Sequence, residues 1–497
     1  MARRAALTPD RRALTFEGTT VTFAQLQARI DRVAAVLQAG GVCPGDRVGF
    51  LGVNHPAFFD VLFAAGRLGA VFVPLNFRLT GPELAFIIGD AGIHTMVVDD
   101  AHREVAGRIR GDLPVHRWIG SESPAAGWDH LPTLAGDADP LTAAAPVTAD
   151  EVALIMYTSG TTGRPKGAML THANLFWSTA NFLNAADFLT DDVTLVCAPL
   201  FHIGGLNVTT LCTWQKGGEV VLMRNFDAAQ ALELIPRYGI TTMFGVPAMF
   251  LFMSQQPGFE QADLTSLRWL LCGGAPVPEP LIKLYNGRGI PFLQGYGLTE
   301  TAPSALLLQA DRALDKVGSA GIEAFFTEVV LMSDDGSVIT EPDVRGEICI
   351  RGPNVMKGYW NRPEATAAAI DERGWFHSGD IGYVDRDGYF SVVDRVKDMV
   401  ITGGENVYPA EVESVLYEHP AVGEVAVIGL PDDRWGEAVV AVVALREGAS
   451  LTLEDLRAFA GERLARYKLP TRLELVDQLP RNPAGKVLKF ELRGLFS

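Results

Sequence analysis

Apolar residues near the start of the chain alternate between a helical and a strand-like pattern. Thr22 and Gln25 form a capping-box pattern in front of apolar residues at helical spacing, and a strand-like run follows at 48–51. A helical period over 57–68 then precedes a buried-strand run at 71–75. Helices that alternate with buried strands are typical of parallel sheets covered by helices, so the sequence predicts the α/β class.

The same alternation continues on both sides of one irregular segment. Residues 121–150 are rich in Pro, Ala, Gly, Ser and Asp and have no period, which predicts a surface connection. The other elements predicted in this part of the chain are a helix at 84–88 and strands at 95–98, 152–157, 194–198, 219–222 and 269–271.

Two later stretches of the sequence predict a different pattern of secondary structure. Short strands and turns follow one another from about residue 325, which predicts a small β-rich subdomain. The last hundred residues predict a small α+β domain, with a boundary near 394–397. Its predicted elements lie at 410–418, 422–429, 438–445 and 453–464.

Length and charge narrow the class of protein. A chain of 497 residues exceeds the roughly 250–300 residues at which a single core stops growing, so at least two domains are expected. The net charge of -17 repels phosphate backbones and argues against a nucleic-acid partner. No apolar segment is long enough to span a membrane, and no secretory signal follows the first basic residues.

The five cysteines are scattered and have no metal-ligand spacing. An odd number without a CxxC pair indicates reduced thiols in a cytoplasmic protein. They are Cys43, Cys197, Cys212, Cys272 and Cys349.

A loop rich in glycine and hydroxyl side chains follows the strand predicted at 152–157. Glycines let the backbone approach an anion, hydroxyls donate to phosphate oxygens, and Lys166 adds a positive charge, so the segment 158–167 predicts a polyphosphate site. It is not a Walker A loop, because Lys166 follows Pro165 and precedes Gly167. A generic Gly/Thr turn is the alternative on composition alone. The candidate phosphate contacts are Thr158, Ser159, Gly160, Thr161, Thr162 and Lys166.

The loop TSGTTGRPKG resembles the signature of the adenylate-forming (ANL) superfamily of acyl-CoA synthetases, firefly luciferases and peptide-synthetase adenylation domains. Six further matches in the family's order extend the resemblance over nearly the whole chain. They are PLFHIGG, CGGAP, QGYGLTE, GWFHSGD, DRVKDMVITGGENVYPAEVE and RNPAGKVLK. The resemblance implies an adenylation domain at 1–394, a hinge at 395–397 and a mobile domain at 398–497 that carries the catalytic lysine.

The resemblance also implies a role for each motif residue. In YGLTE, Tyr296 is the adenine platform, Thr299 a phosphate contact and Glu300 the magnesium ligand; a helix cap is the alternative for Thr299 and Glu300. Asp380 and Arg395 bind the ribose. The remaining nucleotide contacts that the resemblance implies are Gly273, Gly274, Ala275, Gly295 and Gly297.

The hinge and the second domain supply the remaining groups by the same resemblance. Lys397 is the hinge residue, and Gly403 and Gly404 edge the tunnel for the coenzyme A arm. Lys486 is the catalytic lysine, because carboxylate attack on the α-phosphate brings two anions together and needs a bridging cation. The implied cofactors are ATP, Mg²⁺ and coenzyme A.

His202 and the residues Phe244, Gly245 and Val246 are the predicted acyl pocket. An isolated histidine in an apolar stretch is more often a core residue, and the family context places it at the reacting carboxylate. The pocket segments hold no lysine or arginine, which disfavours a dicarboxylate or an amino acid.

The sequence therefore predicts an ATP-dependent acyl-CoA synthetase that forms an acyl-adenylate. A medium- or long-chain fatty acid is the first expected substrate, and an aryl acid of the feruloyl, cinnamoyl or benzoyl type is the second. A luciferase-like oxygenase and a stand-alone peptide-synthetase-type adenylation enzyme are the alternatives of another class.

Overall fold

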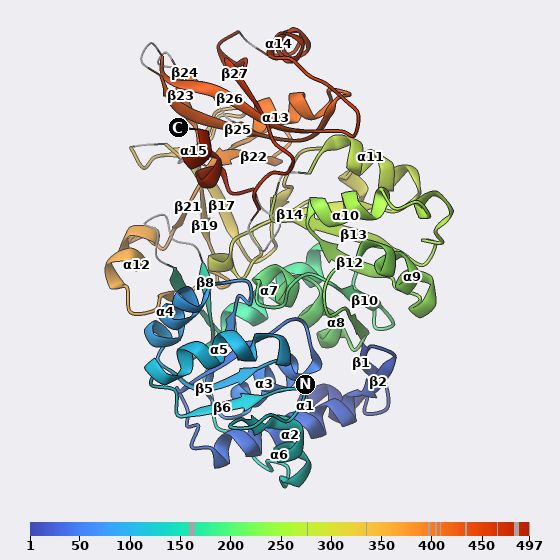
Figure 1. Cartoon of the computed structure of the whole chain (residues 1–497), viewed down its shortest axis with the longest axis vertical. Coiled ribbons are helices and arrows are strands. Elements are labelled where there is room, and N and C mark those ends of the chain that lie inside the picture. The colour runs from blue at the N-terminus through green and yellow to red at the C-terminus, as the bar shows by residue number, and fades with distance from the viewer. Residues whose placement is uncertain are drawn as a thin grey trace.

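The computed structural model describes residues 1–158, 165–275, 277–333, 335–395, 398–402, 405–407, 409–432, 435–464, 466–481 and 487–496. These residues form two large sheets, a β-rich sheet and a C-terminal sheet. In Figure 1 the large sheets and their helices make up the lower part of the molecule, and the C-terminal sheet lies at the top. The predicted α/β class is confirmed.

One large sheet has eight strands in the order β20-β9-β8-β4-β3-β5-β6-β7. Pairing is parallel from β8 to β7 and antiparallel at β9 and β20. Its strands are β3 (Arg47–Leu51), β4 (Val71–Leu75), β5 (Ile93–Val98), β6 (Arg117–Gly120), β7 (Asp129–His130), β8 (Val152–Thr158), β9 (Lys166–Thr171) and β20 (Gly358–Tyr359). The helices of this part are α2 (Phe23–Ala39), α3 (Pro56–Arg67), α4 (Gly81–Ala91), α5 (Arg103–Ile109) and α6 (Leu131–Asp137).

The other large sheet has nine strands in the order β16-β15-β14-β13-β12-β10-β11-β1-β2. Pairing is parallel from β14 to β1 and antiparallel at both edges. Its strands are β1 (Arg12–Phe16), β2 (Thr19–Thr22), β10 (Val193–Val196), β11 (Glu219–Leu222), β12 (Thr242–Gly245), β13 (Trp269–Gly273), β14 (Phe292–Tyr296), β15 (Leu306–Leu307) and β16 (Ile322–Glu323). The neighbouring helices are α1 (Ala2–Leu7), α7 (His172–Ala185), α8 (Thr210–Lys216), α9 (Ala228–Tyr238), α10 (Pro247–Ser254) and α11 (Glu279–Gly287).

The predicted β-rich subdomain is an antiparallel sheet in the order β18-β17-β19-β21-β22. Its chain also supplies β20, which leaves to join the eight-stranded sheet. The bounds are β17 (Glu328–Met332), β18 (Val338–Ile339), β19 (Gly346–Arg351), α12 (Pro363–Ala369), β21 (Phe376–Val384) and β22 (Phe390–Arg395).

The C-terminal part is α+β, as the sequence predicts. The long antiparallel pair of β25 and β26 forms its centre, and β27 adds a parallel strand. The bounds are β23 (Val400–Thr402), β24 (Glu405–Val407), α13 (Pro409–Tyr417), β25 (Val422–Asp432), β26 (Gly436–Leu445), α14 (Leu453–Gly461), β27 (Arg472–Leu475) and α15 (Lys489–Phe496).

A local sequence motif explains where α2 begins, and tertiary packing explains why α6 forms. The Thr22 side chain accepts from the Gln25 backbone N–H and the Gln25 side chain accepts from the Thr22 N–H, so the predicted capping box forms at the start of α2. The predicted surface connection at 121–150 contains β7 and α6, two short elements that its composition does not predict. Leu131 is buried there against the core, with Leu134 packed beside it, so tertiary packing outweighs the weak local pattern.

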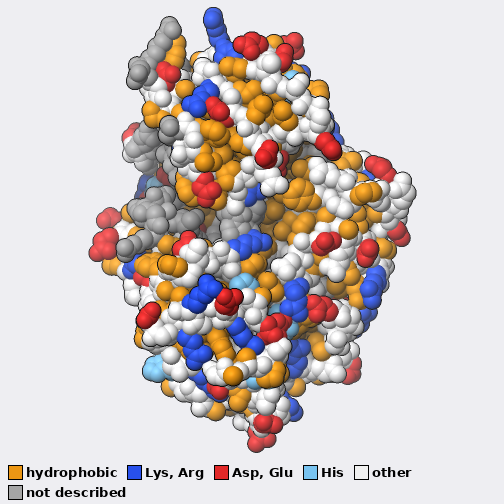
Figure 2. Space-filling view, in the orientation of Figure 1, with side chains coloured by type: hydrophobic (Ala, Val, Ile, Leu, Met, Phe, Trp, Pro, Cys, Tyr) orange, Lys and Arg blue, Asp and Glu red, His pale blue; other side chains and the backbone are white. Residues whose placement is uncertain are grey.

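The surface carries interspersed acidic and basic side chains on the face shown in Figure 2. Hydrophobic side chains gather between the C-terminal part and α10 on this face. Phe252 of α10 and Leu284 of α11 are among the exposed hydrophobic residues. Among the described residues, no helix is long and apolar enough to cross a membrane.

Candidate active site

The predicted phosphate loop joins two neighbouring strands of the eight-stranded sheet. Thr158 ends β8, Lys166 begins β9, and the two residues are paired across the antiparallel ladder. The ammonium group of Lys166 lies 4.5 Å from the centre of the Tyr359 ring, a cation–π contact that holds it on this side of the sheet. Ser159, Gly160, Thr161 and Thr162 lie outside the described residues.

Glu300 lies beside the end of β8 although it is far from it in sequence. It belongs to the single 3₁₀ turn Thr299–Thr301 that follows β14, and only 8% of its surface is exposed. Its Oε1 atom accepts hydrogen bonds from the Thr158 hydroxyl at 3.3 Å and from the Tyr359 hydroxyl at 2.9 Å. Thr299 begins the same turn. The structure thus brings Thr158, Lys166 and Glu300 together.

Tyr359 is the residue of this group that the sequence motifs do not identify. It lies on β20, which pairs with β9 so that Tyr359 is opposite Ala168. Burial and the neighbouring Glu300 carboxylate raise the pKa of the Tyr359 hydroxyl, so it remains a neutral donor to that carboxylate. A two-residue strand has no periodicity of its own, and its only sequence signal is a tyrosine after Lys357 and Gly358.

Tyr296 and Asp380 connect the nine-stranded sheet to the β-rich sheet. Tyr296 ends β14 and Asp380 lies on β21 of the β-rich sheet, with only 4% of its surface exposed. The Tyr296 hydroxyl donates to Asp380 Oδ2 at 2.7 Å. This bond fixes the tyrosine ring, the predicted adenine platform, relative to the carboxylate predicted to bind the ribose.

The predicted nucleotide glycines lie at the carboxyl ends of β13 and β14, where ligands bind in open α/β sheets. Gly274 has φ +83°, a left-handed conformation that favours glycine, and Ala275 follows it. A Cβ atom at Gly297 would overlap the carbonyl oxygen of Pro303, so only glycine fits there. Gly273 and Gly295 are paired across the two strands.

His202 lies just before a five-residue π-helix, Gly204–Val208, a rare conformation that is frequent at functional sites. Its Nε2 atom is buried and has no hydrogen-bond partner among the described residues. Burial, reinforced by the nearby charge of Arg78, lowers the pKa of His202 to about 4. The ring is therefore neutral near pH 7, and its orphaned nitrogen suits a polar ligand atom.

Phe244, a predicted acyl-pocket residue, packs closely against two glycines. Phe244 is 8% exposed at the end of β12, and a Cβ atom at Gly204 would lie 3.0 Å from its ring. A Cβ atom at Gly273 would lie 3.5 Å from the same ring. Gly245 and Val246 follow Phe244 and lead into α10. Glycine at these two positions lets the backbone approach the Phe244 ring closely, so the ring is tightly packed on both sides.

The remaining predicted residues come later in the sequence. Arg395 ends β22, and its backbone pairs with that of Asp380. Lys397, Gly403, Gly404 and Lys486 lie outside the described residues, so their predicted roles stay predictions.

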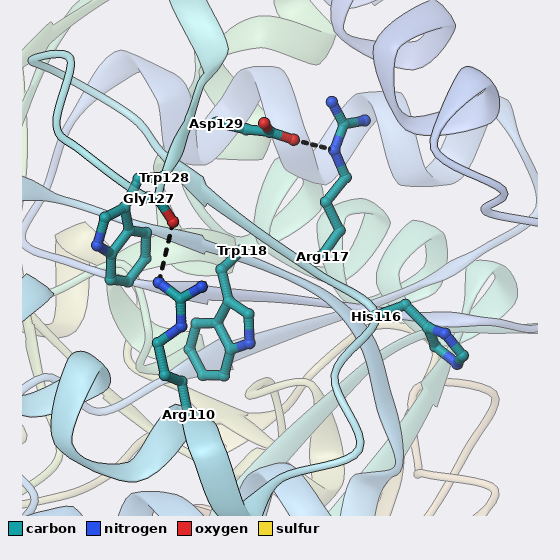
Figure 3. Close-up of a pocket in the computed structure, with 7 residues that line it drawn as sticks. All are labelled: Arg110, His116, Arg117, Trp118, Gly127, Trp128 and Asp129. Carbon is teal, nitrogen blue, oxygen red and sulfur yellow. Dashed lines mark hydrogen bonds and ion pairs between the residues drawn. The ribbon is translucent and has the colours of Figure 1, made fainter.

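A separate surface pocket of about 330 Å³ lies around β6, away from these residues (Figure 3). Arg117 forms an ion pair with Asp129, and Arg110 donates to the carbonyl oxygen of Gly127. The pocket's guanidinium groups are thus engaged within the protein, and no predicted site residue lines the pocket. Its lining is Arg110, His116, Arg117, Trp118, Gly127, Trp128 and Asp129.

Two protein-family models match the chain. The model described as AMP-binding enzyme matches residues 1–360, and the model described as AMP-binding enzyme C-terminal domain matches residues 411–486. The chain belongs to the AMP-binding enzyme family. The predicted resemblance to adenylate-forming acyl-CoA synthetases is confirmed, and with it the acid–thiol ligase class that uses ATP and coenzyme A.

Relatives of this AMP-binding enzyme extend over its whole length. It is 49% identical over 495 residues to feruloyl-CoA synthase of Amycolatopsis sp, with 99% of this chain and 98% of that protein covered. It is 41% identical over 503 residues to the long-chain-fatty-acid–CoA ligase FadD13 of Mycobacterium tuberculosis, with 100% and 98% covered. O-succinylbenzoate coenzyme A synthetase of Bacillus subtilis in complex with ATP and magnesium matches with a TM-score of 0.89 at 35% identity, with 99% and 98% covered.

The residues of this AMP-binding enzyme fit a magnesium ion at Glu300. Both hydrogen bonds to its carboxylate end on Oε1, so within the described part of the chain Oε2 is left for a cation. Mg²⁺ prefers oxygen ligands and is usually held by one or two carboxylates together with substrate phosphates. A buried carboxylate beside the phosphate loop meets that requirement.

Proposed function

We propose that the protein activates an aryl acid, of the hydroxycinnamate or benzoate type, and transfers it to coenzyme A in the cytoplasm. The observation that carries this choice is the closed packing around Phe244. Its ring belongs to a buried apolar cluster. The other fully packed members include Phe182, Phe188, Trp269, Leu271, Leu293 and Leu307.

A compact ring fits such a pocket better than a long alkyl chain. Protein interiors are packed at the density of organic crystals, so a long chain could enter only by displacing side chains of the cluster. The unpartnered Nε2 of His202 is available to a polar atom of the acid, and the family context assigns it to the reacting carboxylate that both candidates share. The 49% identity to a feruloyl-CoA synthase supports the same choice.

Adenylation requires the acid's carboxylate to attack the α-phosphate of ATP, with pyrophosphate as the leaving group. We assign the phosphates to Thr158, Lys166 and the loop between them, and the magnesium ion to Glu300. Bound there, the ion neutralises phosphate charge. Tyr359 holds Glu300 in place through its hydrogen bond, and Lys486 supplies the charge that bridges the two anions.

The ribose and adenine contacts orient the nucleotide, and thereby the α-phosphate that the acid's carboxylate attacks. Asp380 accepts the ribose hydroxyls in charge-assisted hydrogen bonds, and Tyr296, tied to it, supports the adenine ring. Thioester formation then needs other groups at the same carbonyl. We assign it to the face of the 398–497 domain that carries Gly403 and Gly404, presented by rotation about Lys397.

A fatty acid is the second candidate, because FadD13 is 41% identical over the whole chain. The two candidates differ in the depth of pocket that they need. A long-chain acid requires the cluster behind Phe244 to open, whereas an aryl acid does not.

A panel of ferulate, cinnamate, benzoate, octanoate and palmitate, assayed for AMP release with coenzyme A, separates the candidates. We expect ferulate or cinnamate to give the highest kcat/KM and palmitate the lowest. In Phe244→Leu the preference should move toward octanoate by about tenfold, the size of effect that one or two methylene groups have in an apolar pocket. Phe252→Ala, at an exposed position of α10, is the matched control.

Palmitate as the best substrate of the unchanged protein would contradict the aryl-acid proposal. If Phe244→Leu and Phe252→Ala change the substrate preference equally, the Phe244 ring does not bound the pocket.

A further inference from the structure

Three potential metal ligands lie together on the β-rich sheet, apart from the roles assigned above. Glu347 and Cys349 are on β19 and His377 is on β21, where Cys349 and His377 are directly paired across the two strands. A carboxylate oxygen, Cys349 Sγ and a ring nitrogen of His377 all lie within 4.8 Å of one another. Thiolate, imidazole and carboxylate together are the ligands that Zn²⁺ takes in proteins.

The distances suit a tetrahedral ion after a small adjustment. Cys349 Sγ lies 3.5 Å from His377 Nδ1, and two such ligands on a tetrahedral zinc are about 3.6 Å apart when Zn–S is ~2.3 Å and Zn–N ~2.05 Å. Glu347 Oε2 lies 2.8 Å from the same nitrogen as a hydrogen-bond partner. An ion needs this pair to open by about 0.5 Å, given Zn–O of ~2.0 Å.

The surroundings of the cluster support metal binding. The other ring nitrogen of His377, Nε2, faces Asp371 Oδ2 at 3.9 Å, and a carboxylate behind a ligating imidazole orients it and raises its basicity. The side chains of His377 and Glu347 are 31% and 27% exposed, so solvent ions can reach them, whereas Cys349 is fully buried. Burial and the charges of Glu347 and Asp371 raise the pKa of the Cys349 thiol, which makes it a poor nucleophile without a metal.

Glu347 connects this cluster to the nucleotide site. Its other oxygen, Oε1, accepts a hydrogen bond from the Gly379 N–H at 2.9 Å, and the next residue is Asp380. A carboxylate that turns toward a metal ion therefore pulls on the backbone that positions the predicted ribose ligand.

We propose that Glu347, Cys349 and His377 form a binding site for a zinc-like divalent ion, and that occupation of this site lowers adenylation. Binding displaces one proton from the Cys349 thiol, and a water molecule completes the coordination. The site is distinct from the magnesium position at Glu300 and takes a softer ion.

Cobalt absorption on the full-length protein tests the binding. We expect EDTA-treated protein to bind one Co²⁺ per chain with a thiolate-to-cobalt charge-transfer band, and Zn²⁺ to abolish the band. Cys349→Ser should lose the band and weaken Zn²⁺ binding by at least about tenfold, because even an outer partner of a metal ligand is worth about 10- to 100-fold. Cys43→Ser, which removes the one exposed thiol among the five, should keep both.

Activity provides the second readout. ATP–pyrophosphate exchange with excess Mg²⁺ should fall with added Zn²⁺ in Cys43→Ser and stay unchanged in Cys349→Ser. Absence of the band in Cys43→Ser, or its persistence in a folded Cys349→Ser protein, overturns the proposal. The cobalt band needs no acid substrate, so it reports on the metal site even if the aryl-acid proposal fails.

Discussion

At this site, hydrogen bonds to one or two neighbours fix the orientation of single side chains. The Tyr359 hydroxyl is fixed as a donor to Glu300, and the Tyr296 hydroxyl as a donor to Asp380. His202 is the contrasting case, because its buried Nε2 has no partner among the described residues. Such an atom costs stability in the free protein and gains a partner when a ligand binds.

The lowered pKa of His202 predicts how stability depends on pH. Between pH 6.5, the ordinary pKa of histidine, and about pH 4, the unfolded chain binds a proton at this residue while the folded protein does not. Stability from a neutral His202 is therefore complete above pH 6.5 and is lost as the pH falls toward 4. Lowering the pH from 7 to 4.5 should reduce the free energy of unfolding of both proteins. This reduction should be about 1–2 kcal/mol smaller in His202→Gln than in the unchanged protein.

Urea unfolding at several pH values measures this difference. His116→Gln, at an exposed histidine, is the control and should follow the unchanged protein. Parallel pH dependence of His202→Gln and the unchanged protein would show that His202 is protonated equally in both states.

The sequence identified most acidic and aromatic residues of the site because they stand inside contiguous motifs. Tyr359 was missed because its role depends on β20 crossing from one sheet to another, which no local pattern encodes. The orphaned state of His202 likewise follows from three-dimensional packing, so the sequence could suggest the residue and not its protonation.

At the scale of elements, short turns at strand ends carry most of the site. β13 ends in Gly273, glycines flank Tyr296 at the end of β14, and the 3₁₀ turn after β14 places Glu300 against β8. Periodicity predicted most of the long strands and the helices α2, α3 and α4, whereas it did not predict the two-residue strands or the helices α6, α7, α9 and α11. Their position is decided by the surfaces on which they pack.

Gly297 tests how tightly this turn is built. A Cβ atom there would overlap the Pro303 carbonyl oxygen, which is backbone and cannot move alone. Gly297→Ala should lower stability by about 1–3 kcal/mol, the cost of overpacking, and raise KM for ATP by displacing Glu300. Gly287→Ala in α11, where a Cβ atom meets nothing within 4 Å, should change neither quantity. An unchanged thermal midpoint and KM in Gly297→Ala would refute the proposed close approach.

At the scale of the whole molecule, the site joins three sheets, and the proposed catalytic lysine belongs to the C-terminal domain. Because adenylation is assigned to Lys486 and thioester formation to the Gly403 and Gly404 face of the same domain, a substitution at Lys486 should separate the two half-reactions. Lys486→Ala should lose adenylate formation by about 100-fold or more, the loss expected for a group that stabilises developing charge, and should retain thioester formation from supplied acyl-AMP. Pyrophosphate exchange measures the first step and thioester formation the second. Equal losses in both steps would contradict the assignment.

The position of β20 limits which sequence changes keep the hydrogen bond between Tyr359 and Glu300. Side chains of a strand alternate between faces, so moving the register of β20 by one residue would bring Trp360, which has no hydroxyl, to the place of Tyr359 beside Glu300. A change that shifts this register would therefore remove the hydroxyl donor to Glu300, whereas a change confined to the connection between β19 and β20 that keeps the register would retain it.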